Sequence, residues 1–508
     1  MISKIFILVF LINNLIIINA NQQKVISPDD FGRLQKQMNS VNPSNNSALN
    51  VQEHLFNPNS PYAKALEAIF GIGVRLQLLL EKTEANKKNF LVSPLSMAVT
   101  VGELMLGARG DLRNYLAELL IIDGANSITD KTAIGEKRED IPLLNIHQQL
   151  GTLLRDLQQH GDLENTYILE TASALFLQPE LHLNKLFEDS IRSIYDTSII
   201  PVNFSTDPLG SFKFINNWAT KSTRGKINQI LPAPLPVTSS AVLANAIYFK
   251  ADWETPFSDE LSAEGIFHTA QNESVKVTYL RGQFDISYVE SKELNCSMIV
   301  LPYKNKKMSM YLILPKKGTK YEFDLKSFTT SLRSKDIIDL IKLTQLRSVR
   351  VILPKINLSS TISLLDPLKK YQEYKNELQK MPKLLSKYSS KPLTNKYDIL
   401  DEKIDTYKDI EKEISLDSRV DITVGTQKDP IDLSGASLDA RFKLTDIVQQ
   451  MSLAINEKGT EAAAITASTI SLSGGIKNFE ANRPFMFFIR HEMTEAILFW
   501  GTIVNAAH

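Results

Sequence analysis

The sequence predicts an α+β protein, because helix-like and strand-like patterns both occur along one long chain. Apolar residues recur at helical spacing from 62 to 80 and again from about 146 to 159, whereas residues 460–469 alternate in the manner of a β-strand. Hydrophobic residues make up 43% of the 508 residues, which is enough for a large core. A chain of this length ordinarily forms two or three domains, and one large domain is the alternative.

The first 60 residues are expected to lie outside the fold. Residues 1–20 place Lys4 before an apolar run from Ile5 to Ile18, with a cleavage position after Ala20, an arrangement typical of a secretory signal peptide. Residues 21–60 are rich in Asn, Ser, Pro and Gln without periodicity, which predicts a disordered extension. With no other long apolar segment, we expect a secreted, extracellular protein without a membrane anchor.

The charge balance and the single cysteine exclude some classes of protein. Basic and acidic residues number 57 each, so no overall charge favours nucleic acid or a membrane surface. Cys296 stands alone, so this secreted chain is expected to rely on its core rather than on an internal disulfide. Candidate glycosylation sites follow from five Asn-x-Ser/Thr sequons, at Asn45, Asn203, Asn272, Asn295 and Asn357.

The region where the globular part begins predicts helices joined by polar segments. A helix over 62–80 is followed by a short strand from Phe90 that leads into a second helix, with Ser93 or Ser96 placed to cap it. Residues 121–140 are expected to form a polar loop before the amphipathic helix near 146–159. The folded domain is therefore expected to start near residue 61.

A run of small residues near the C-terminus is the most informative segment. It reads Asn-Glu-Lys-Gly-Thr-Glu-Ala-Ala-Ala-Ile-Thr over 456–466, and as an isolated string it also suits an alanine-rich helix. The β-branched Thr and Ile residues disfavour that helix. As a strand, one face would carry only small side chains, at Thr460, Ala462, Ala464, Thr466 and Ser468.

This segment and a series of motifs in the same order resemble the serpin family of serine protease inhibitors. The motifs are Ser-Pro-Leu-Ser at 93–96, Leu-Gly-Ala-Arg-Gly-Asp at 106–111, Leu-Ala-Asn-Ala-Ile-Tyr-Phe-Lys at 243–250, Asn-Arg-Pro-Phe at 482–485 and Phe-Trp-Gly at 499–501. The resemblance covers about 61–507. It implies the serpin fold over 61–508, with mixed β-sheets surrounded by helices and an exposed C-terminal reactive loop at about 457–480.

The resemblance also implies a mechanism and a reactive bond. A target serine protease would cut the loop, form a covalent complex, and be trapped when the loop enters a sheet as a new strand. Counting fourteen residues on from Gly459 and eleven back from Pro484 reaches Ser473 both times, so the bond Ser473-Gly474 is the expected cut. The corresponding hinge residues are Glu457, Gly459, Thr460, Glu461, Ala462, Ala463 and Ala464.

The residues beside the expected cut indicate the class of protease. No Arg or Lys occurs from 470 to 475, so a trypsin-like enzyme, with an acid in its specificity pocket, has no partner there. Ser473 suits an elastase-like enzyme, and a cut after Leu472 would suit a chymotrypsin-like one. Both alternatives stay open.

Several positions match groups that control opening of the sheet in serpins. Glu457 and Lys355 match an ion pair at the head of the hinge, and Trp253 matches an aromatic residue packed beside it. Ser93, Ser96 and Asn245 match a polar cluster under the sheet centre. Where many serpins carry a histidine in that cluster, this chain has Gln449, which can bridge hydrogen bonds but does not titrate near neutral pH.

A charged insertion interrupts the resemblance at about 370–420. Lys369–Lys396 contains eight Lys and two Glu, whereas 398–417 contains eight acidic residues and three Lys. A solvated loop or helical hairpin whose two halves attract each other is one interpretation. Contact with a polyanion or a protein partner through Lys369–Lys396 is the other.

Other functions find less support in the sequence. Enzyme motifs such as Gly-x-Ser-x-Gly or His-Glu-x-x-His are absent, and the seven His are scattered, so no catalytic residue, metal site or cofactor is expected. A non-inhibitory serpin acting as a carrier, chaperone or interaction protein is the alternative, since a fold does not determine function. We expect a monomer.

Overall fold

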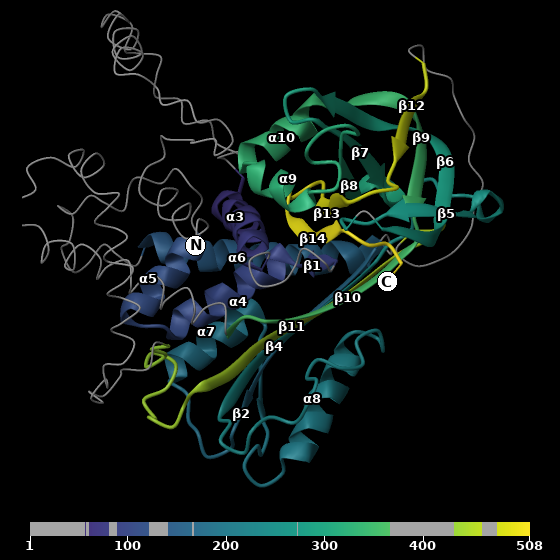
Figure 1. Ribbon diagram of the computed structural model, residues 1–508. Coiled ribbons are helices and arrows are strands. Elements are labelled where there is room, and N and C mark those ends of the chain that lie inside the picture. The colour runs from purple at the N-terminus through teal and green to yellow at the C-terminus, as the bar shows by residue number, and fades with distance from the viewer. Residues whose placement is uncertain are drawn as a thin grey trace, which may run out of the picture. The chain divides into compact units, whose positions relative to one another are not determined.

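The computed structural model describes residue 56 and residues 60–80, 89–120, 141–164, 167–271, 273–365, 431–459 and 475–507 (Figure 1). Within these residues helices surround two β-sheets, which confirms the predicted α+β fold. The helices are α3 Ala63–Leu80, α4 Pro94–Gly107, α5 Gly110–Leu119, α6 Ile141–Glu164, α7 Lys185–Tyr195, α8 Pro208–Ser222, α9 Leu325–Ser331 and α10 Ser334–Leu343, with 3-10 turns η3 Asp259–Leu261 and η4 Lys304–Lys306.

The strands account for most of the chain between α6 and the C-terminus. They are β1 Phe90–Val92, β2 Ile168–Leu177, β3 Ser198–Pro201, β4 Ala241–Lys250, β5 Ala263–His268, β6 Ser274–Ser291, β7 Cys296–Pro302, β8 Met308–Pro315, β9 Gln345–Pro354, β10 Ile356–Ser363, β11 Leu444–Ile455, β12 Lys477–Glu480, β13 Phe485–His491 and β14 Ile497–Ile503.

The start of helix α4 follows from its capping residues. Ser93 has an extended backbone, and its hydroxyl oxygen accepts a hydrogen bond from the Ser96 amide at 3.2 Å. Pro94 then occupies the first turn, where its missing N–H leaves no helical hydrogen bond unmade. Of the two predicted caps, the structure therefore selects Ser93.

Helix α6 is longer than the sequence pattern predicted. It extends at both ends beyond 146–159 and contains Pro142 in its first turn, a position that favours a helix start. Apolar periodicity marks only the part of a helix that packs against the core, so the polar C-terminal turn escaped detection, and the apolar first turn, which contains Pro142, was not assigned to the helix. The predicted loop at 121–140 lies outside the described residues.

The five-stranded sheet has the order β10-β11-β4-β2-β3 and separates two hydrophobic clusters. Along β4, Leu243, Ile247 and Phe249 join the main core on the side of α4, whereas Val242 and Ala244 pack in a smaller cluster with α8. Figure 1 shows α8 and α4 on opposite sides of this sheet. The sheet is therefore the middle layer of this part of the molecule.

The two sheets are joined at one short connection. The larger sheet has the order β1-β14-β13-β8-β7-β6-β9-β12, with β5 paired to β6. Its strand β9 ends at Pro354, and β10 of the five-stranded sheet begins at Ile356. Only Lys355 lies between them, and its amide bonds to the carbonyl oxygen of Thr278 at 2.8 Å. The β10 edge is thus held firmly to the larger sheet.

Candidate functional site

Strands β4 and β11 lie side by side in the middle of the five-stranded sheet. They pair in parallel from Leu444 with Ala241 to Ser452 with Tyr248. Because β4 and β11 run in the same direction, a strand of the opposite direction placed between them could pair antiparallel with both. The predicted hinge follows directly after β11, so the end of β11 is where this sheet and the loop meet.

A tight turn reverses the chain directly after β11. The side-chain oxygen Oδ1 of Asn456 accepts from the amides of Lys458 and Gly459 at 3.0 and 3.2 Å, and the Asn456 amide donates to the Gly459 carbonyl at 3.0 Å. Gly459 then pairs antiparallel with Asp252, just beyond β4. The chain leaves the described region already aligned with β4.

Gly459 is required at this position for two reasons. Its φ of +149° lies in a region that residues with a side chain rarely adopt. A Cβ atom would also lie 2.3 Å from the carbonyl oxygen of Ala251, inside any permitted contact. The hinge glycine named from sequence is therefore the one residue type that allows this close approach to the strand.

Trp253 holds the turn in place. Its backbone amide donates to the Lys458 carbonyl at 2.9 Å, and its indole Nε1 donates to the Asn456 carbonyl at 3.0 Å. The buried indole stacks on the Tyr303 ring with centroids 4.5 Å apart and an interplanar angle of 11°. Two hydrogen bonds and a large stacked surface thus fix where the loop begins.

An ion pair joins the same turn to the larger sheet. Lys355 Nζ lies 3.0 Å from Glu457 Oε2 and 3.4 Å from Oε1, and the Ser262 hydroxyl donates to Oε1 at 3.0 Å. Burial alone would raise the pKa of Glu457, but hydrogen bonds from its own backbone, Lys355 and Ser262 hold that pKa below its ordinary value. Glu457 therefore stays ionised and paired at neutral pH.

A second polar cluster lies under the centre of the sheet. Gln449 on β11 is paired with Asn245 on β4, and both side chains reach helix α4. Gln449 Nε2 donates to Ser96 Oγ at 2.5 Å, and Asn245 Nδ2 donates to Thr100 Oγ1 at 2.7 Å. Helix α4 is thus hydrogen-bonded to both sides of the junction, whereas the hydroxyl of Ser93 serves as the helix cap.

Sequence reasoning missed two members of this cluster, Thr100 and Glu103. Glu103 is only 2% exposed, and its Oε1 accepts hydrogen bonds from the hydroxyls of Ser173, at 2.7 Å, and Thr197. Its Oε2 has no hydrogen-bond partner among the described residues. The signal was available, because Ser96, Thr100 and Glu103 form a polar stripe at helical spacing in an otherwise apolar helix.

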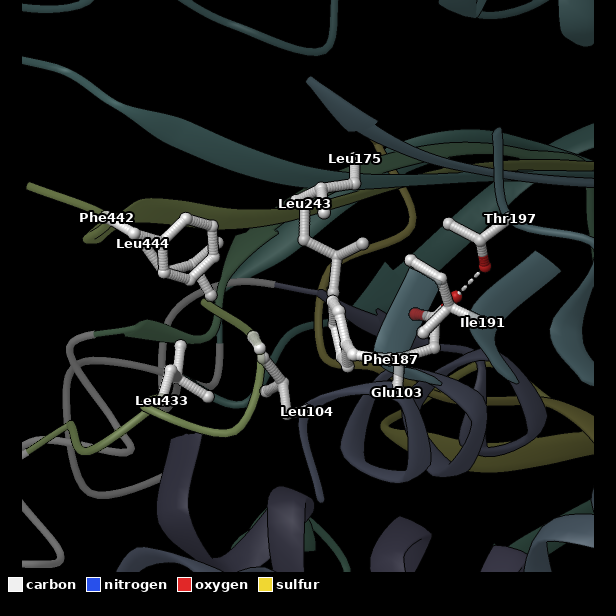
Figure 2. Close-up of a pocket in the computed structure, with 11 residues that line it drawn as sticks. Glu103, Leu104, Leu175, Phe187, Ile191, Thr197, Leu243, Leu433, Phe442 and Leu444 are labelled. Atoms are coloured by element: carbon white, nitrogen blue, oxygen red, sulfur yellow. Dashed lines mark hydrogen bonds between the residues drawn. The ribbon is translucent and has the colours of Figure 1, made fainter. Parts of the chain in front are cut away.

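Glu103 also lines a small hydrophobic pocket below the sheet (Figure 2). The other lining groups are almost all apolar and come from β2, β4, β11, α7 and the segment before β11, and the figure places Glu103 and Thr197 together at one side. Burial raises the pKa of Glu103 to about 7, although its hydrogen bonds oppose the rise. The carboxylate is the titratable group of this pocket.

Several predicted positions lie outside the described residues. They are Leu472, Ser473 and Gly474 at the expected cut, the hinge residues Thr460, Glu461, Ala462, Ala463 and Ala464, the insertion near 370–420, and the sequons at Asn45 and Asn272.

The remaining sequons differ in their surroundings. Asn357 is exposed on β10, Asn295 is half-buried with a φ of 51°, and half-buried Asn203 accepts hydrogen bonds through its Oδ1, one of them from the Thr206 amide at 3.1 Å. None of the three is fully buried. Glycosylation at these positions stays a prediction.

The described residues contain neither a metal-binding cluster nor a membrane-spanning helix. In that part of the chain, no cluster of three or more His, Cys, Asp or Glu side chains could hold a metal ion. None of its helices is both long and apolar enough to cross a membrane.

Comparison with known proteins identifies similar chains. The family model described as "Serpin (serine protease inhibitor)" matches residues 69–393 and 421–506, so the match is interrupted within the predicted insertion. Serpin B6 of Pongo abelii is 26% identical over 433 residues, covering 84% of this chain and 96% of its own length. Leukocyte elastase inhibitor of Bos taurus is 27% identical over 443 residues, with the same coverage of 84% and 96%.

Solved structures with this architecture include thyroxine-binding globulin in complex with thyroxine, at a TM-score of 0.64 and 22% identity over 88% of this chain and 99% of that one. The thermophilic serpin tengpin in its native state has a TM-score of 0.63 at 22% identity, over 87% and 94%. Identities this low show a shared fold.

Proposed function

Because this chain belongs to the serpin family, we propose that it is a secreted serine protease inhibitor that traps its target by inserting its own cleaved loop into the five-stranded sheet. The junction between β4 and β11 is the observation that carries the proposal. These parallel strands are neighbours, and the chain leaving β11 already turns back beside β4 at Gly459. A cleaved loop therefore has a defined place to enter.

The pairing of Gly459 with Asp252 sets a register for the loop if it continues as a strand. Moving back along β4 and forward along the loop, Ala464 comes opposite Ile247. Counting instead from the turn along β11 places Ala464 opposite Met451. Ile247 and Met451 are themselves partners in the closed sheet, so the two counts agree. A strand in this register fits between β4 and β11.

The same register explains why one face of the loop carries only small side chains. Residues directly opposite each other in antiparallel strands point to the same side of the sheet. Ile247 and Met451 are both fully buried, so Ala464 would enter the main core, and Thr466 would lie between Asn245 and Gln449. The predicted small residues are those that would have to fit beneath existing packing.

The chemical step is the first half of ordinary proteolysis, in which the acyl-enzyme ester forms but is not hydrolysed. The serine oxygen of the protease attacks the carbonyl carbon of Ser473, and the bond from that carbon to the nitrogen of Gly474 breaks. An ester then links the loop to the protease, and Gly474 becomes a new amino terminus. Insertion removes the ester-linked protease before water hydrolyses the ester.

One half of the sheet has to shift for insertion. Neighbouring strands lie about 4.8 Å apart, so a new strand moves β4 away from β11 by about that distance. The β10-β11 half is held to the larger sheet through Lys355 and the Glu457 ion pair. We therefore assign the movement to β4, β2 and β3.

The expected targets are elastase-like or chymotrypsin-like proteases. Ser473 presents a small side chain and Leu472 a larger apolar one, and the loop offers no basic residue beside them. The similarity to the bovine leukocyte elastase inhibitor supports the first class. A signal peptide at 1–20, glycosylation at the sequons, a monomeric state and partner binding through Lys369–Lys396 belong to the same proposal.

Replacing Ser473 by arginine should redirect the inhibitor. We expect wild-type protein to form a denaturant-resistant complex with an elastase-like or chymotrypsin-like protease, and Ser473→Arg to form it with a trypsin-like protease instead, because arginine pairs with the acid in that pocket. Electrophoresis under denaturing conditions measures the complex. The mass of the released peptide shows whether the cut follows Leu472 or Ser473.

Cleavage of the wild-type loop by elastase-like and chymotrypsin-like proteases, without any covalent complex, would contradict the proposal. That result would favour the alternative of a non-inhibitory carrier, chaperone or interaction protein.

A further inference from the structure

Helix α4 lies beneath the junction and is hydrogen-bonded to both halves of the sheet that insertion would separate. On one side Ser96 accepts from Gln449 of β11, and on the other Thr100 accepts from Asn245 of β4. Glu103, one turn further along α4, accepts its hydrogen bonds from Ser173 and Thr197, which belong to the β4-β2-β3 half. The hydrogen bonds to Glu103 differ from those to Ser96 and Thr100, because both of them converge on one buried carboxyl group.

Three parts of the moving half meet at Glu103. Ser173 belongs to β2 and donates to Oε1 at 2.7 Å, and Thr197, directly before β3, donates to the same oxygen. Asn245 of β4 acts on the same carboxyl group by lowering its pKa, while its own side chain donates to Thr100. Strand β2 and the residue before β3 are therefore tied to α4 through Glu103, and β4 is tied to α4 through Thr100.

We propose that Glu103 is a positioning residue for loop insertion, which holds β2 and β3 over α4 in the closed sheet and whose release sets how readily the sheet opens. This inference rests on the proposed function, since it concerns opening of the same junction. A lateral shift of about 4.8 Å cannot preserve hydrogen bonds of 2.7 Å made by a short side chain. Opening must break the contacts of Glu103.

The unpartnered oxygen of Glu103 decides which protonation state the closed sheet favours. Oε2 faces a pocket whose lining is otherwise almost entirely apolar, where an ionised carboxylate is poorly solvated (Figure 2). The closed sheet therefore favours the protonated form, in keeping with a pKa of about 7. Once the strands move, water reaches the group and the ionised form becomes the stable one.

The other titratable groups around Glu103 do not change charge near neutral pH. Tyr195 of α7 has its pKa raised well above the ordinary value by burial and by Glu103, and its hydroxyl contacts His147 Nδ1 of α6 at 2.5 Å. Burial, with a smaller contribution from Arg113 of α5, lowers the pKa of His147 to about 4. Glu103 is thus the group in this cluster that titrates between pH 5.5 and 8.

The sign of the pH effect follows from these states. The closed sheet binds the proton of Glu103 more tightly than the open sheet does, so the stability that protonation gives the closed sheet is fully present below about pH 4.5. It is lost as the pH rises through about 7. Opening should therefore become easier between pH 5.5 and pH 8.

A peptide-insertion assay tests this without any protease. A synthetic peptide with the sequence of residues 460–472 is incubated with the intact protein, and its rate of stable incorporation is measured from pH 5.5 to pH 8. For wild type we expect a rise of roughly tenfold over this range. Glu103→Gln should give a flat profile, and Glu103→Met a flat profile with faster incorporation, because Ser173 and Thr197 lose their partner.

Glu264→Gln, which removes an exposed carboxylate on β5, is the matched control and should behave as wild type. A pH profile in Glu103→Gln as steep as in wild type would overturn the inference, as would incorporation by Glu103→Met no faster than wild type. Failure of wild type to take up the peptide at any pH would also count against it.

The two proposals fail in different ways. pH-dependent uptake of the peptide without a covalent protease complex would contradict inhibition but leave Glu103 in its role. Normal covalent complexes with the protease, together with pH-independent uptake of the peptide, would support inhibition but contradict the role of Glu103.

Discussion

Replacing Ala464 by arginine is expected to convert this protein from an inhibitor into a substrate. In the register set by Gly459, the proposed insertion would bring Ala464 into the core between Ile247 and Met451, which are both 0% exposed. Burying an unpaired charge costs several kcal/mol, and each 1.36 kcal/mol corresponds to tenfold in a rate. Slower insertion lets water release the protease first, so the molar ratio needed for full inhibition should rise at least about tenfold.

Ala463→Arg is the matched control, because it places the same charge one residue away on the other face. There the neighbours would be the buried Tyr248 and the half-buried Ser452, on the side of the sheet away from the main core. Titration of a fixed amount of protease measures the ratio, and electrophoresis gives the fraction cleaved. Equal loss of inhibition in both variants would mean that the assigned faces are wrong.

Locking β4 to β11 should abolish inhibition reversibly. Ala244 and Val448 are paired in the closed sheet and both are buried on the α8 side, so cysteines at these positions would join the two strands covalently. The oxidised double variant Ala244→Cys with Val448→Cys cannot separate the strands and should be cleaved without forming a complex. Reduction should restore complex formation, because nothing else has changed.

The two single cysteine variants serve as controls and should inhibit under both redox conditions. Cys296 is buried in β7 and does not provide an alternative partner on β4 or β11. A fully oxidised double variant that still forms covalent complexes would show that inhibition does not require this junction to open.

Local signals in the sequence were sufficient for much of the fold. The helical period of 62–80 corresponds to α3, and the Ser-Pro pair at 93–94 marks the start of α4 through capping rules that act over a few residues. The hinge glycine was identified from the resemblance of its segment to the serpin hinge, and it proves to be the residue whose φ and close approach exclude a side chain. Helix periods and caps depend on neighbours in the chain, whereas the close approach of Gly459 to Ala251 does not.

Contacts between residues that are far apart in the chain could not be predicted from the sequence. Glu103 is one charged residue in an apolar helix, and only the packing of β2 and β4 over that helix shows that it is buried and hydrogen-bonded. Likewise Gln449 was recognised as a departure from the family pattern, but its contact with Ser96 depends on residues 353 positions apart. The registers of β4 and β11 arise from the same tertiary contacts.

The most direct test of loop insertion is the thermal stability of the protein before and after the loop is cut. An inserted strand of about ten residues gains backbone hydrogen bonds on both edges, for which roughly 5–10 kcal/mol is a reasonable scale. At about 2 °C per kcal/mol, the Tm of the cleaved protein should exceed that of the intact protein by about 10–20 °C. An unchanged or lower Tm after complete cleavage at Ser473-Gly474 would contradict insertion between β4 and β11.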